Sequence, residues 1–476
     1  MTAPRWLIVV AVYAAVAGCA SGVARSPSPA SDARVEAFVD SLQARTFAYF
    51  WETTNPNNGL APDRWPNPPF ASIAAIGFAL AAYPIGVERQ WISRVDAAER
   101  ALTTLQFLWR LPQGPDTVGF AGDHGFFYHF LDMETGLRHG KTELSTIDTA
   151  LLLAGALVAQ QYFSGPDSRE ASIRAYADSL YRRVEWPYFL RDQRPLITMA
   201  WRPERGFGPH AYRGYDEAMI LYVLALGSPT YPVEPQAWTA FTSTYEWAEF
   251  HGFAHVNFPP LFGHQYSHVF IDFRGIQDAY MRPRGIDYFE NSQRATLSQR
   301  QYAIANPGKW ADYGPEIWGL TASDGPTDTT IVIGGIARRF RGYWARGAAA
   351  PYINDDGTIA PTAAGGSIPF APALAMRALV AMRERYGDDL YARYGFLDAF
   401  NPTLQDTTVR LRRGRTVQNK GWFDDNYLGI DQGPIVAMIE NHRTGLIWEL
   451  MKKNPYIARG LCRAGFTGGW ISGRCN

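Results

Sequence analysis

The chain of 476 residues carries 45 basic and 45 acidic side chains, so its formal net charge is zero. This balance disfavours a nucleic-acid partner, because contacts with phosphates require a basic field. The length allows one large domain or two, and no Pro/Ser-rich linker divides the chain after residue 35, which favours one domain over 34–476.

The N-terminus has the features of an export signal. Arg5 precedes an apolar stretch over 6–17 that is far shorter than the roughly 20 residues of a membrane-spanning helix. The next letters, VAGC ending at Cys19, have the form of a bacterial lipobox. We therefore expect a lipoprotein signal peptide over 1–18, cleavage before Cys19 and acylation of its thiol. A plain secretory signal with a chance cysteine is the alternative.

The segment after the lipobox predicts where the protein is held. Ala20, rather than an aspartate, follows Cys19, which favours sorting to the outer membrane of a Gram-negative host. Residues 19–33 are rich in Ser, Ala and Pro and predict a flexible tether. We expect a monomer anchored by lipid to the cell envelope, on the periplasmic side or at the cell surface.

Cysteine usage indicates one disulfide and no metal centre. Cys462 and Cys475 lie close together in a Gly-rich tail, and an exported chain favours a bond between them. No Cys/His group has the spacing of zinc ligands. We expect neither a metal nor a cofactor.

Helical periodicity dominates the chain. The predicted helices span 34–51, 71–85, 92–110, 145–163, 168–184, 215–227, 235–248, 291–305, 368–387 and 432–452. Strand-like alternation is scarce, and its best examples begin at Thr329 and Thr407. Long connections rich in Gly, Pro and aromatic residues lie over 110–144, 185–213, 249–290 and 306–367. Loops of this length are usually functional, and we expect them to wall a groove.

The predicted helices alternate in character. The helix over 145–163 is almost wholly apolar, as a buried helix would be. The helix over 168–184 carries charges on one face, including Arg174 and Arg182, and 215–227 is apolar again. This succession of inner and outer helices predicts an all-α fold, an α/α toroid in which the inner helices run parallel.

Three apolar segments each begin with acidic residues. They read ELSTIDTALLLAG from Glu143, GYDEAMILYVLAL from Gly214 and GIDQGPIVAMIE from Gly429. Parallel inner helices would bring their N-termini, and hence these acids, to one end of the toroid. An acid beside an apolar core has a pKa that its surroundings can shift. We expect an acidic hollow there, an arrangement typical of a site that cleaves sugars.

The strongest catalytic candidate is Glu217, which follows Asp216 at the start of an apolar helix. An apolar wall raises the pKa of a carboxyl and suits a general acid, although both acids could instead cap the helix. Asp148 and Glu143 are candidates for the general base. Asp148 also fits a capping box that starts at Ser145, which is its structural alternative.

A wider set of residues combines rings with polar groups in loops. The candidates for binding sugar rings or hydroxyls are Asp216, Asp431, Trp201, Arg202, His264, His268, Asp272, Arg274, Trp318, Asp324, Trp422 and Asp425. His264 and His268 could ligate a metal on a helix, but no third ligand is evident. Calcium at Asp424 and Asp425 is another alternative, which would need six or more oxygens.

These motifs resemble those of the glycoamylase-like domain. The segments that carry the likeness are the acid-led runs from Glu143 and Tyr215, the stretch FIDFRG from Phe270, and DNYLGIDQGP from Asp425. This domain occurs in bacterial endo-β-1,2-glucanases (glycoside hydrolase family 144) and in relatives tied to cyclic β-1,2-glucan synthesis. The likeness covers roughly residues 35–455.

The resemblance implies an (α/α)6 toroid, no metal chemistry and hydrolysis of β-1,2-glucan with inversion. Glu217 would protonate the leaving oxygen while Asp148 or Glu143 activates water, with the two carboxyls about 6.5–9.5 Å apart. A surface glycan-binding lipoprotein without catalysis, a polysaccharide lyase on the same toroid and a transglycosylase remain alternatives.

Overall fold

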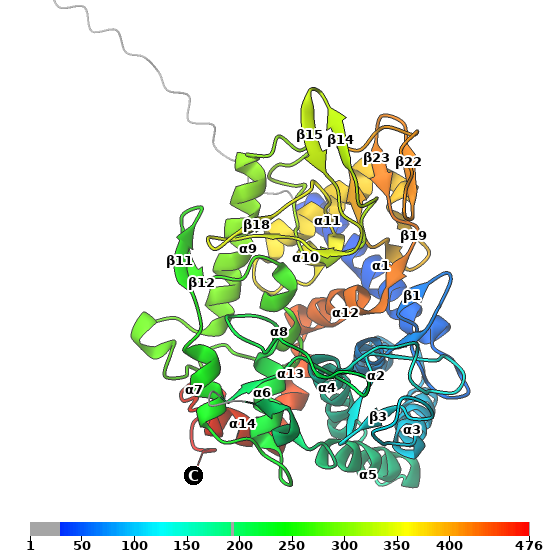
Figure 1. The fold of residues 1–476 in the computed structure, drawn as a ribbon, viewed down its shortest axis with the longest axis vertical. Helices are drawn as coiled ribbons and strands as arrows, with labels where there is room; N and C mark the ends of the chain where they lie inside the picture. Colours follow the sequence, from blue (N-terminus) through cyan, green and yellow to red (C-terminus); the bar gives the residue numbers. More distant parts are fainter. Residues whose placement is uncertain (1–28, 192–194, 476) are drawn as a thin grey trace, which may run out of the picture.

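The computed structural model describes residues 29–191 and 195–475 (Figure 1). The expected signal peptide, Cys19 and most of the tether therefore lie outside the described residues. Helix α1 begins at Pro29, so the last part of the segment 19–33 is helical rather than an irregular tether.

The described residues contain the following α-helices. They are α1 (Pro29–Thr53), α2 (Ile73–Glu88), α3 (Arg94–Arg110), α4 (Thr146–Tyr162), α5 (Ser168–Arg182), α6 (Met219–Gly227), α7 (Gln236–Thr242), α8 (Tyr266–Phe270), α9 (Tyr288–Ala305), α10 (Pro361–Gly365), α11 (Pro372–Tyr386), α12 (Gly429–Arg443), α13 (Leu446–Lys453) and α14 (Pro455–Arg463).

The helices form two concentric layers, an (α/α)6 toroid, which confirms the predicted fold class. The inner layer consists of the even-numbered helices α2 to α12, whose residues are almost all buried. Around this ring α2 packs on α4, α4 on α6, α6 on α8, and α12 on α8, α10 and α2. The side chain of Gln265, just before α8, closes the remaining gap by donating to the carbonyl of Ala363 in α10.

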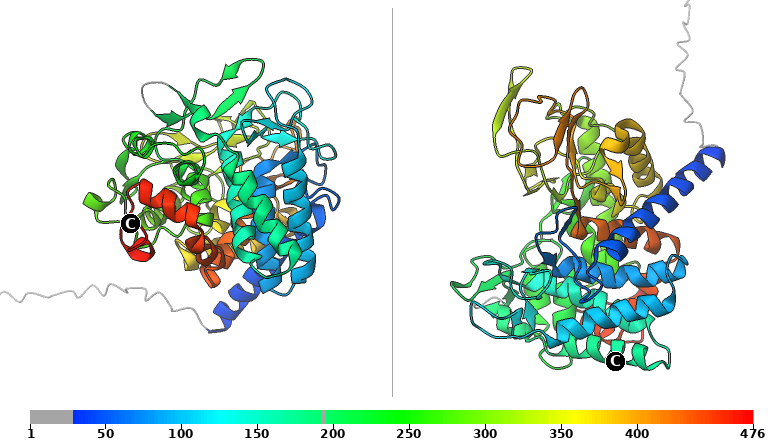
Figure 2. Two further views of the ribbon diagram at one scale, coloured as in Figure 1. Left: turned by 90° about the horizontal axis from the view of Figure 1, so that it is seen from below. Right: turned by 90° about the vertical axis from the view of Figure 1, so that its right-hand side faces the viewer.

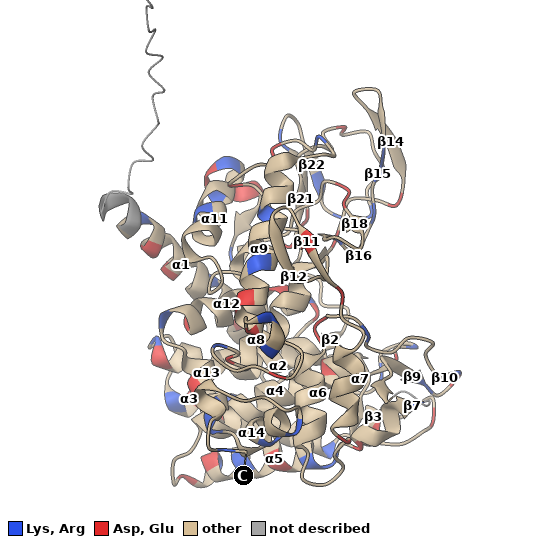
Figure 3. Ribbon diagram, turned by 90° about the vertical axis from the view of Figure 1, so that its left-hand side faces the viewer, with Lys and Arg blue, Asp and Glu red and all other residues tan. Residues whose placement is uncertain are grey.

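The odd-numbered helices α1 to α11 form the outer layer and expose one face (Figures 1 and 2). Charged residues of both signs lie scattered over the outer elements (Figure 3). After the sixth pair, α13 packs on α4 and α8, and α14 packs on α6. A disulfide joins Cys462 to Cys475, the pair that the sequence singles out.

The inner ring is tight because glycines face each other across it. A Cβ atom on Gly155 of α4 would lie 1.9 Å from the carbonyl oxygen of Gly77 in α2. A Cβ atom on Gly77 would lie 2.3 Å from the carbonyl oxygen of Leu151. Only a residue without a side chain allows the two backbones to approach this closely.

Short antiparallel strands connect the loops. They pair as β1 (Arg64–Trp65) with β24 (Tyr427–Leu428), β2 (Ala71–Ser72) with β5 (Phe130–Leu131), β3 (Gly122–Asp123) with β4 (Phe126–Phe127), β7 (Leu190–Arg191) with β8 (Leu196–Ile197), β11 (Trp247–Phe250) with β12 (Phe253–Val256), β13 (Ala322–Ser323) with β16 (Trp344–Ala345), β14 (Thr330–Ile333) with β15 (Ile336–Arg339), β17 (Gly347–Ala348) with β18 (Ile353–Asn354), and β19 (Tyr391–Ala392) with β20 (Gly395–Phe396). Two sheets have three strands, β10 (Gly206–Phe207)–β9 (Ala200–Arg202)–β6 (Leu144–Ser145) and β21 (Phe400–Asn401)–β23 (Gly421–Phe423)–β22 (Arg415–Val417).

Several predicted elements differ from the structure. The helix expected over 235–248 ends at Thr242, and β11 follows it. The helix expected over 432–452 is divided between α12 and α13 by Gly445, which adopts a φ of 71°. The segment from Thr407 to Leu411 is not a strand, whereas β14 lies within the strand expected from Thr329. The inner helices α8 and α10 have five residues each, too few to show a helical period.

Strands β2, β6 and β24 end where α2, α4 and α12 begin, so strand pairs surround the N-terminal end of the inner ring. Among the described residues, no helix combines the length and the apolar character needed to cross a membrane.

Candidate active site

The acidic motifs meet at the N-terminal end of the inner ring. Glu143 lies just before β6, and Asp148 lies in the first turn of α4. Asp431 lies in the first turn of α12. Asp216 and Glu217 lie in the turn before α6, which starts at Met219, rather than inside the helix as the sequence suggests.

A histidine links two of these acids. The ring of His129 contacts Glu143 Oε1 through Nδ1 at 3.0 Å and Asp148 Oδ2 through Nε2 at 3.4 Å. It also stacks on Phe130 with ring centroids 3.9 Å apart. Burial acts to lower the pKa of His129, but the charge of Asp148 and the hydrogen bond that His129 donates to Glu143 outweigh it and raise the pKa to about 9. His129 is therefore an imidazolium at neutral pH.

Glu143 is held as a carboxylate. Its Oε2 accepts a hydrogen bond from Arg202, which β9 places beside β6. Burial acts to raise the pKa of Glu143, but the hydrogen bond and charge of His129 and the charge of Arg202 lower it to about 2. Both oxygens of Glu143 are thus committed to cationic partners.

Asp148 has a different set of contacts. Its backbone N–H donates to Ser145 Oγ at 3.2 Å, as expected for a capped helix. The Ser145 hydroxyl in turn donates to Asp148 Oδ2. The predicted capping box is only half formed, because the carboxylate of Asp148 accepts from the serine hydroxyl and faces His129 instead of returning to the backbone.

The pKa of Glu217 is raised, in contrast to that of Glu143. Burial raises the pKa of Glu217 to about 7, and the negative charge of Asp148 adds to this effect. Its backbone carbonyl accepts a hydrogen bond from Ser267 Oγ of α8 at 2.7 Å, which fixes the turn before α6. The site thus brings a carboxyl that is about half protonated at pH 7 within electrostatic range of Asp148.

Asp216 is a structural neighbour of Glu217. Its Oδ1 accepts the backbone N–H of Ala218 at 2.9 Å, and its residue is 5% exposed. Burial and the charge of Glu217 raise the pKa of Asp216 well above its usual range. This position fits a cap of the turn rather than the sugar contact that the sequence suggests.

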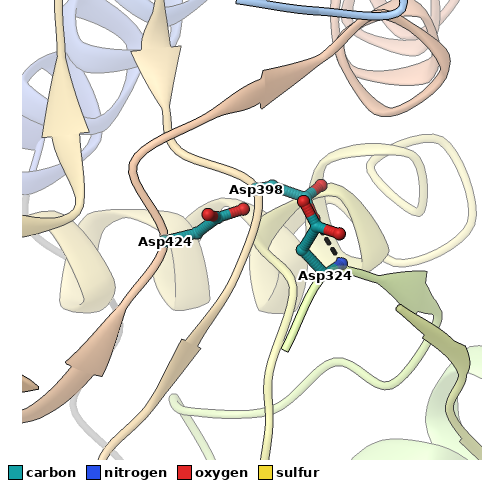
Figure 4. A group of neighbouring side chains, drawn as sticks. All are labelled: Asp324, Asp398 and Asp424. Carbon is teal, nitrogen blue, oxygen red and sulfur yellow. Dashed lines mark hydrogen bonds between the residues drawn. The ribbon is translucent and has the colours of Figure 1, made fainter. Parts of the chain in front are cut away.

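A second acidic group lies beside the first. Its members are Asp63, Asp324, Asp398, Asp424 and Asp431, three of which Figure 4 shows. Burial raises the pKa of the Tyr266 hydroxyl, and the charges of Asp431, Glu217 and Asp148 raise it further. The charge of Asp63 also raises the pKa of His129. The two groups are therefore within electrostatic range of each other at the same end of the ring.

Arginines neutralise part of this second group. Arg64 donates to Asp63 Oδ2 at 3.1 Å and to Asp324 Oδ2 at 2.8 Å. Arg413 reaches the same oxygen of Asp324 at 3.0 Å. These guanidinium groups lie partly exposed while the aspartates are buried.

Tyr343 provides an aromatic surface next to the second acidic group. It is 57% exposed, yet the surrounding protein and the charge of Asp431 raise the pKa of its hydroxyl well above the usual value. The ring is thus accessible to solvent although protein and buried acids lie around it. An exposed aromatic face of this kind can stack on a ligand.

Two of the tryptophan candidates belong to the core. Trp318 and Trp422 are both 0% exposed, and Trp422 donates from Nε1 to the carbonyl of Arg413. The expectation that they stack on a sugar is wrong in this structure, because no ring face is accessible. Trp422 packs in a small buried cluster with Phe340 and Leu404, which are distant from Trp422 in the sequence or lie in another segment.

The histidine and arginine candidates around α8 are also structural. His264 stacks on Tyr215, His268 contacts Ser292 Oγ at 3.0 Å, and neither side chain is exposed. Burial lowers the pKa of His268 to about 3, so it is neutral. Asp272 and Arg274 pair with each other beyond the C-terminal end of α8, away from the acids. The prediction that these four residues belong to the site is therefore wrong.

Other candidates stay near it. Trp201 and Arg202 are half-buried in β9, and Arg202 contacts Glu143. Asp425 is exposed and accepts a hydrogen bond from Asn426 at 2.8 Å.

Sequence reasoning missed several residues of the site. His129, Arg64, Asp398 and Arg413 come from loops or strands without helical period. A weak signal existed for two of them, because His129 and Asp398 are lone polar residues within the apolar runs FFYHF and FLDAF. Such residues are buried among apolar neighbours only when a partner satisfies them.

The layered fold and the acids at one end of the inner ring define the class of toroidal carbohydrate-active proteins. The family model with the description "Putative glucoamylase" matches residues 209–455. The chain belongs to this glycoamylase-like family.

Three relatives show what similar proteins do. An exo beta-1,2-glucooligosaccharide sophorohydrolase (non-reducing end) from Parabacteroides distasonis is 30% identical over 460 residues, which cover 90% of this chain and 57% of that protein. This chain therefore spans little more than half the length of that relative. An endo-beta-1,2-glucanase from Chitinophaga pinensis, solved with sophorotriose and glucose, is 28% identical with a TM-score of 0.77, over 92% of this chain and 99% of that chain.

A solved protein from Bacteroides uniformis carries the same description as the family. It is 34% identical with a TM-score of 0.78, over 92% of this chain and 98% of that chain. This match extends well beyond the segment 209–455 that the family model matches, because it covers 92% of the chain.

Proposed function

We propose that this protein is a glycoside hydrolase that cleaves β-1,2-linked glucan with inversion of the anomeric carbon. The observation that carries the proposal is that Glu217, whose pKa is about 7, lies within electrostatic range of Asp148. A general acid must hold a proton at the working pH, whereas a general base must not. The named activities of two relatives support β-1,2-glucan as the substrate.

In this mechanism Glu217 protonates the leaving oxygen, directly or through a substrate hydroxyl. Asp148 activates a water molecule on the opposite face of the sugar ring. Asp148 fits the role of base better than Glu143, because both oxygens of Glu143 bind cations and its pKa of about 2 makes it a weak base. His129 and Ser145 contact the carboxylate of Asp148 and orient it.

The acid-rich hollow disfavours the lyase alternative. A lyase binds a uronate and has to neutralise its carboxylate, which calls for a basic groove. Here the described acids outnumber the arginines around them, so a neutral glucan is the better substrate.

Endo action is the finer part of the proposal. The name of the Chitinophaga pinensis relative, an endo-beta-1,2-glucanase, supports endo action, whereas the name of the Parabacteroides distasonis relative supports exo action as the alternative. Product sizes from linear β-1,2-glucan test this, because endo action gives a ladder of oligosaccharides while exo action releases one short product.

The roles of the two acids can be separated with two substrates. Glu217→Gln should lower turnover of β-1,2-glucan by at least about 10³-fold. It should lower turnover of an aryl sophoroside with a good leaving group much less, since that group departs without a proton. Asp148→Asn should impair both substrates, because both need the activated water. The exposed Glu246→Gln variant serves as the surface control.

Two results would contradict the assignment. Near-wild-type hydrolysis of the glucan by Glu217→Gln would remove its role as acid. β-configured reducing ends in the first product, detected by proton NMR, would show retention instead of inversion. Parallel reactions with β-1,3- and β-1,4-glucans test the linkage, and equal rates would overturn the specificity for β-1,2 bonds.

We also propose that Cys19 carries a lipid that anchors the enzyme to the cell envelope. The lipobox and the following Ala20 support this location. Cys19→Ser should move the protein from the membrane fraction to the soluble fraction, and mass spectrometry of the mature N-terminus should find the lipid. A mature protein that starts at Met1, or that carries no lipid, would refute the anchor.

A further inference from the structure

The second acidic group contains an unusual set of unsatisfied atoms. Among all buried carboxylate oxygens of residues 29–191 and 195–475, three have no hydrogen-bond partner in the structure. They are Asp398 Oδ1, Asp424 Oδ2 and Asp431 Oδ2. All three residues belong to this one group, and they are 2%, 0% and 2% exposed. A buried, unpaired carboxylate oxygen is costly, so a positively charged or protonated partner must compensate for it.

The carboxylates converge on one point. Asp324, Asp398 and Asp424 each place an oxygen within 4.8 Å of the other two (Figure 4). Asp431 adds a fourth carboxyl, which lies within hydrogen-bond reach of Asp398. In Asp398 and Asp424 the second carboxylate oxygen accepts a hydrogen bond from the backbone. The N–H of Asp324 donates to Asp398 Oδ2 at 2.7 Å, and the N–H of Asp425 donates to Asp424 Oδ1 at 2.8 Å.

The arginines of the group do not reach the unpaired oxygens. Arg64 is shared between Asp63 and Asp324, and Arg413 also contacts Asp324. Asp398, Asp424 and Asp431 have no salt bridge to any described residue. Other buried aspartates in the described chain do have one: Asp356 pairs with Arg346, and Asp272 pairs with Arg274 and Lys452.

We propose that Asp324, Asp398 and Asp424, with Asp431 beside them, bind a divalent cation, of which Ca²⁺ fits the site best. Oxygens on one calcium ion lie at most about twice the Ca–O distance of roughly 2.4 Å apart, which matches the observed separation. Carboxylate oxygens without thiol or imidazole partners select hard cations over zinc. Water and the second carboxylate oxygens complete the coordination. This proposal departs from the expectation of no metal.

Protonation is the competing way to satisfy the group. Burial and mutual repulsion raise the pKa values of Asp398 and Asp424 well above their usual range, and that of Asp431 to about 7. Without a cation the carboxyls would therefore share protons. A divalent cation would displace these protons and ionise the carboxyls, so its binding should release protons and weaken as the pH falls.

The cation would join parts of the chain that are distant in sequence. Asp324 follows β13, Asp398 lies between β20 and β21, and Asp424 follows β23. Asp431 opens the inner helix α12. Binding would therefore fix three loops to the inner ring beneath Tyr343 and stabilise the whole folded protein.

Terbium provides a direct probe of this site, because it replaces calcium and emits when nearby tryptophan is excited. Trp422 lies in β23 and precedes Asp424 by two residues. The purified full-length protein is treated with a chelator, dialysed and titrated with Tb³⁺, and then Ca²⁺ is added to compete. Calorimetry with Ca²⁺ in two buffers of different ionisation enthalpy measures the proton release.

The matched variants are Asp424→Asn and Asp425→Asn. Asp424 is buried in the group, whereas its neighbour Asp425 is exposed. We expect saturable sensitised emission with wild-type protein, displaced by Ca²⁺, and a rise of the melting temperature by about 3 °C or more in saturating Ca²⁺. Asp424→Asn should weaken binding at least about tenfold, whereas Asp425→Asn should change it less than about twofold.

Several outcomes would overturn the proposal. One is the absence of both emission and any shift of the melting temperature with Ca²⁺, Mg²⁺ or Mn²⁺, which would show that the carboxyls share protons instead. Another is equal binding by Asp424→Asn and wild type, which would place the ion elsewhere. If Asp424→Asn does not fold, Asp398→Asn and the wild-type titration decide in the same way. None of these measurements depends on the glucanase activity.

Discussion

His129 offers the sharpest quantitative test of the site. Its pKa is about 9 in the folded protein, compared with 6.5 for an unperturbed histidine. A raised pKa means that protonation stabilises the fold: the contribution is fully present below pH 6.5 and is lost as the pH rises through about 9. The difference of 2.5 pKa units corresponds to about 3 kcal/mol at pH 5.5, about 2 kcal/mol at pH 7.5 and less than about 0.5 kcal/mol at pH 9.5.

The substitution His129→Gln keeps a polar side chain but removes the charge between Glu143 and Asp148. Urea unfolding of wild type and variant at these three pH values gives the difference in the free energy of unfolding. This difference should fall by about 3 kcal/mol between pH 5.5 and 9.5, on top of any constant loss of packing. Glu143 does not disturb the comparison, because an ordinary glutamate is already ionised at pH 5.5.

His124→Gln is the matched control. His124 also contacts a carboxylate, Glu185 Oε2 at 2.8 Å, but this pair lies on the surface, where solvent screens it. The difference for this variant should stay within about 0.5 kcal/mol over the same range. If the difference for His129→Gln were equally flat, His129 would be neutral and our view of Asp148 as an oriented base would be wrong.

Three further predictions concern the acid, the inner ring and the tail. Because the pKa of Glu217 is raised from 4.5 to about 7 in the folded protein, activity should fall about tenfold per pH unit above pH 7. The stability favoured by its neutral form is fully present below pH 4.5, declines between pH 4.5 and 7 and is lost above pH 7. Glu217→Gln should then be more stable than wild type at pH 8 by up to about 3 kcal/mol in urea unfolding. A pH-independent difference would contradict this. Gly155→Ala should cost about 2–4 kcal/mol in the same assay, since its Cβ would lie 1.9 Å from the carbonyl oxygen of Gly77, and a loss below about 0.5 kcal/mol would show that α2 and α4 can separate freely. Cys475→Ser opens the loop closed by the bond to Cys462, which has a sequence separation of 13, and should cost about 3 kcal/mol under oxidising conditions but nothing in reductant.

The sequence predicted most of the helical framework correctly. Helices α2 and α4 are long and almost wholly apolar, as buried helices would be, whereas α3 is amphipathic, as an outer helix would be. The inner helices α8 and α10 were not predicted, because a helix of five residues completes little more than one turn. Their helical conformation depends on packing against the ring.

The candidate site was predictable only in part. Glu143, Asp148, Glu217 and Asp431 stand next to apolar helices, and the sequence therefore identified them. By contrast, the tryptophan candidates failed because a large apolar ring is as suitable for a core as for a sugar platform. The choice between these uses depends on which side chains from other segments cover the ring.

The amino-acid order by itself determined the alternation of buried and amphipathic helices, and with it the concentric fold and the end at which the acids gather. These properties depend on residues three or four positions apart, which interact whatever the rest of the chain does. Only the tertiary structure decided the charge states: near pH 7 His129 is cationic, Glu143 is ionised and Glu217 is about half protonated, because side chains from different loops surround them. Electrostatic free energy depends on distance and burial, and neither quantity exists until the chain has folded.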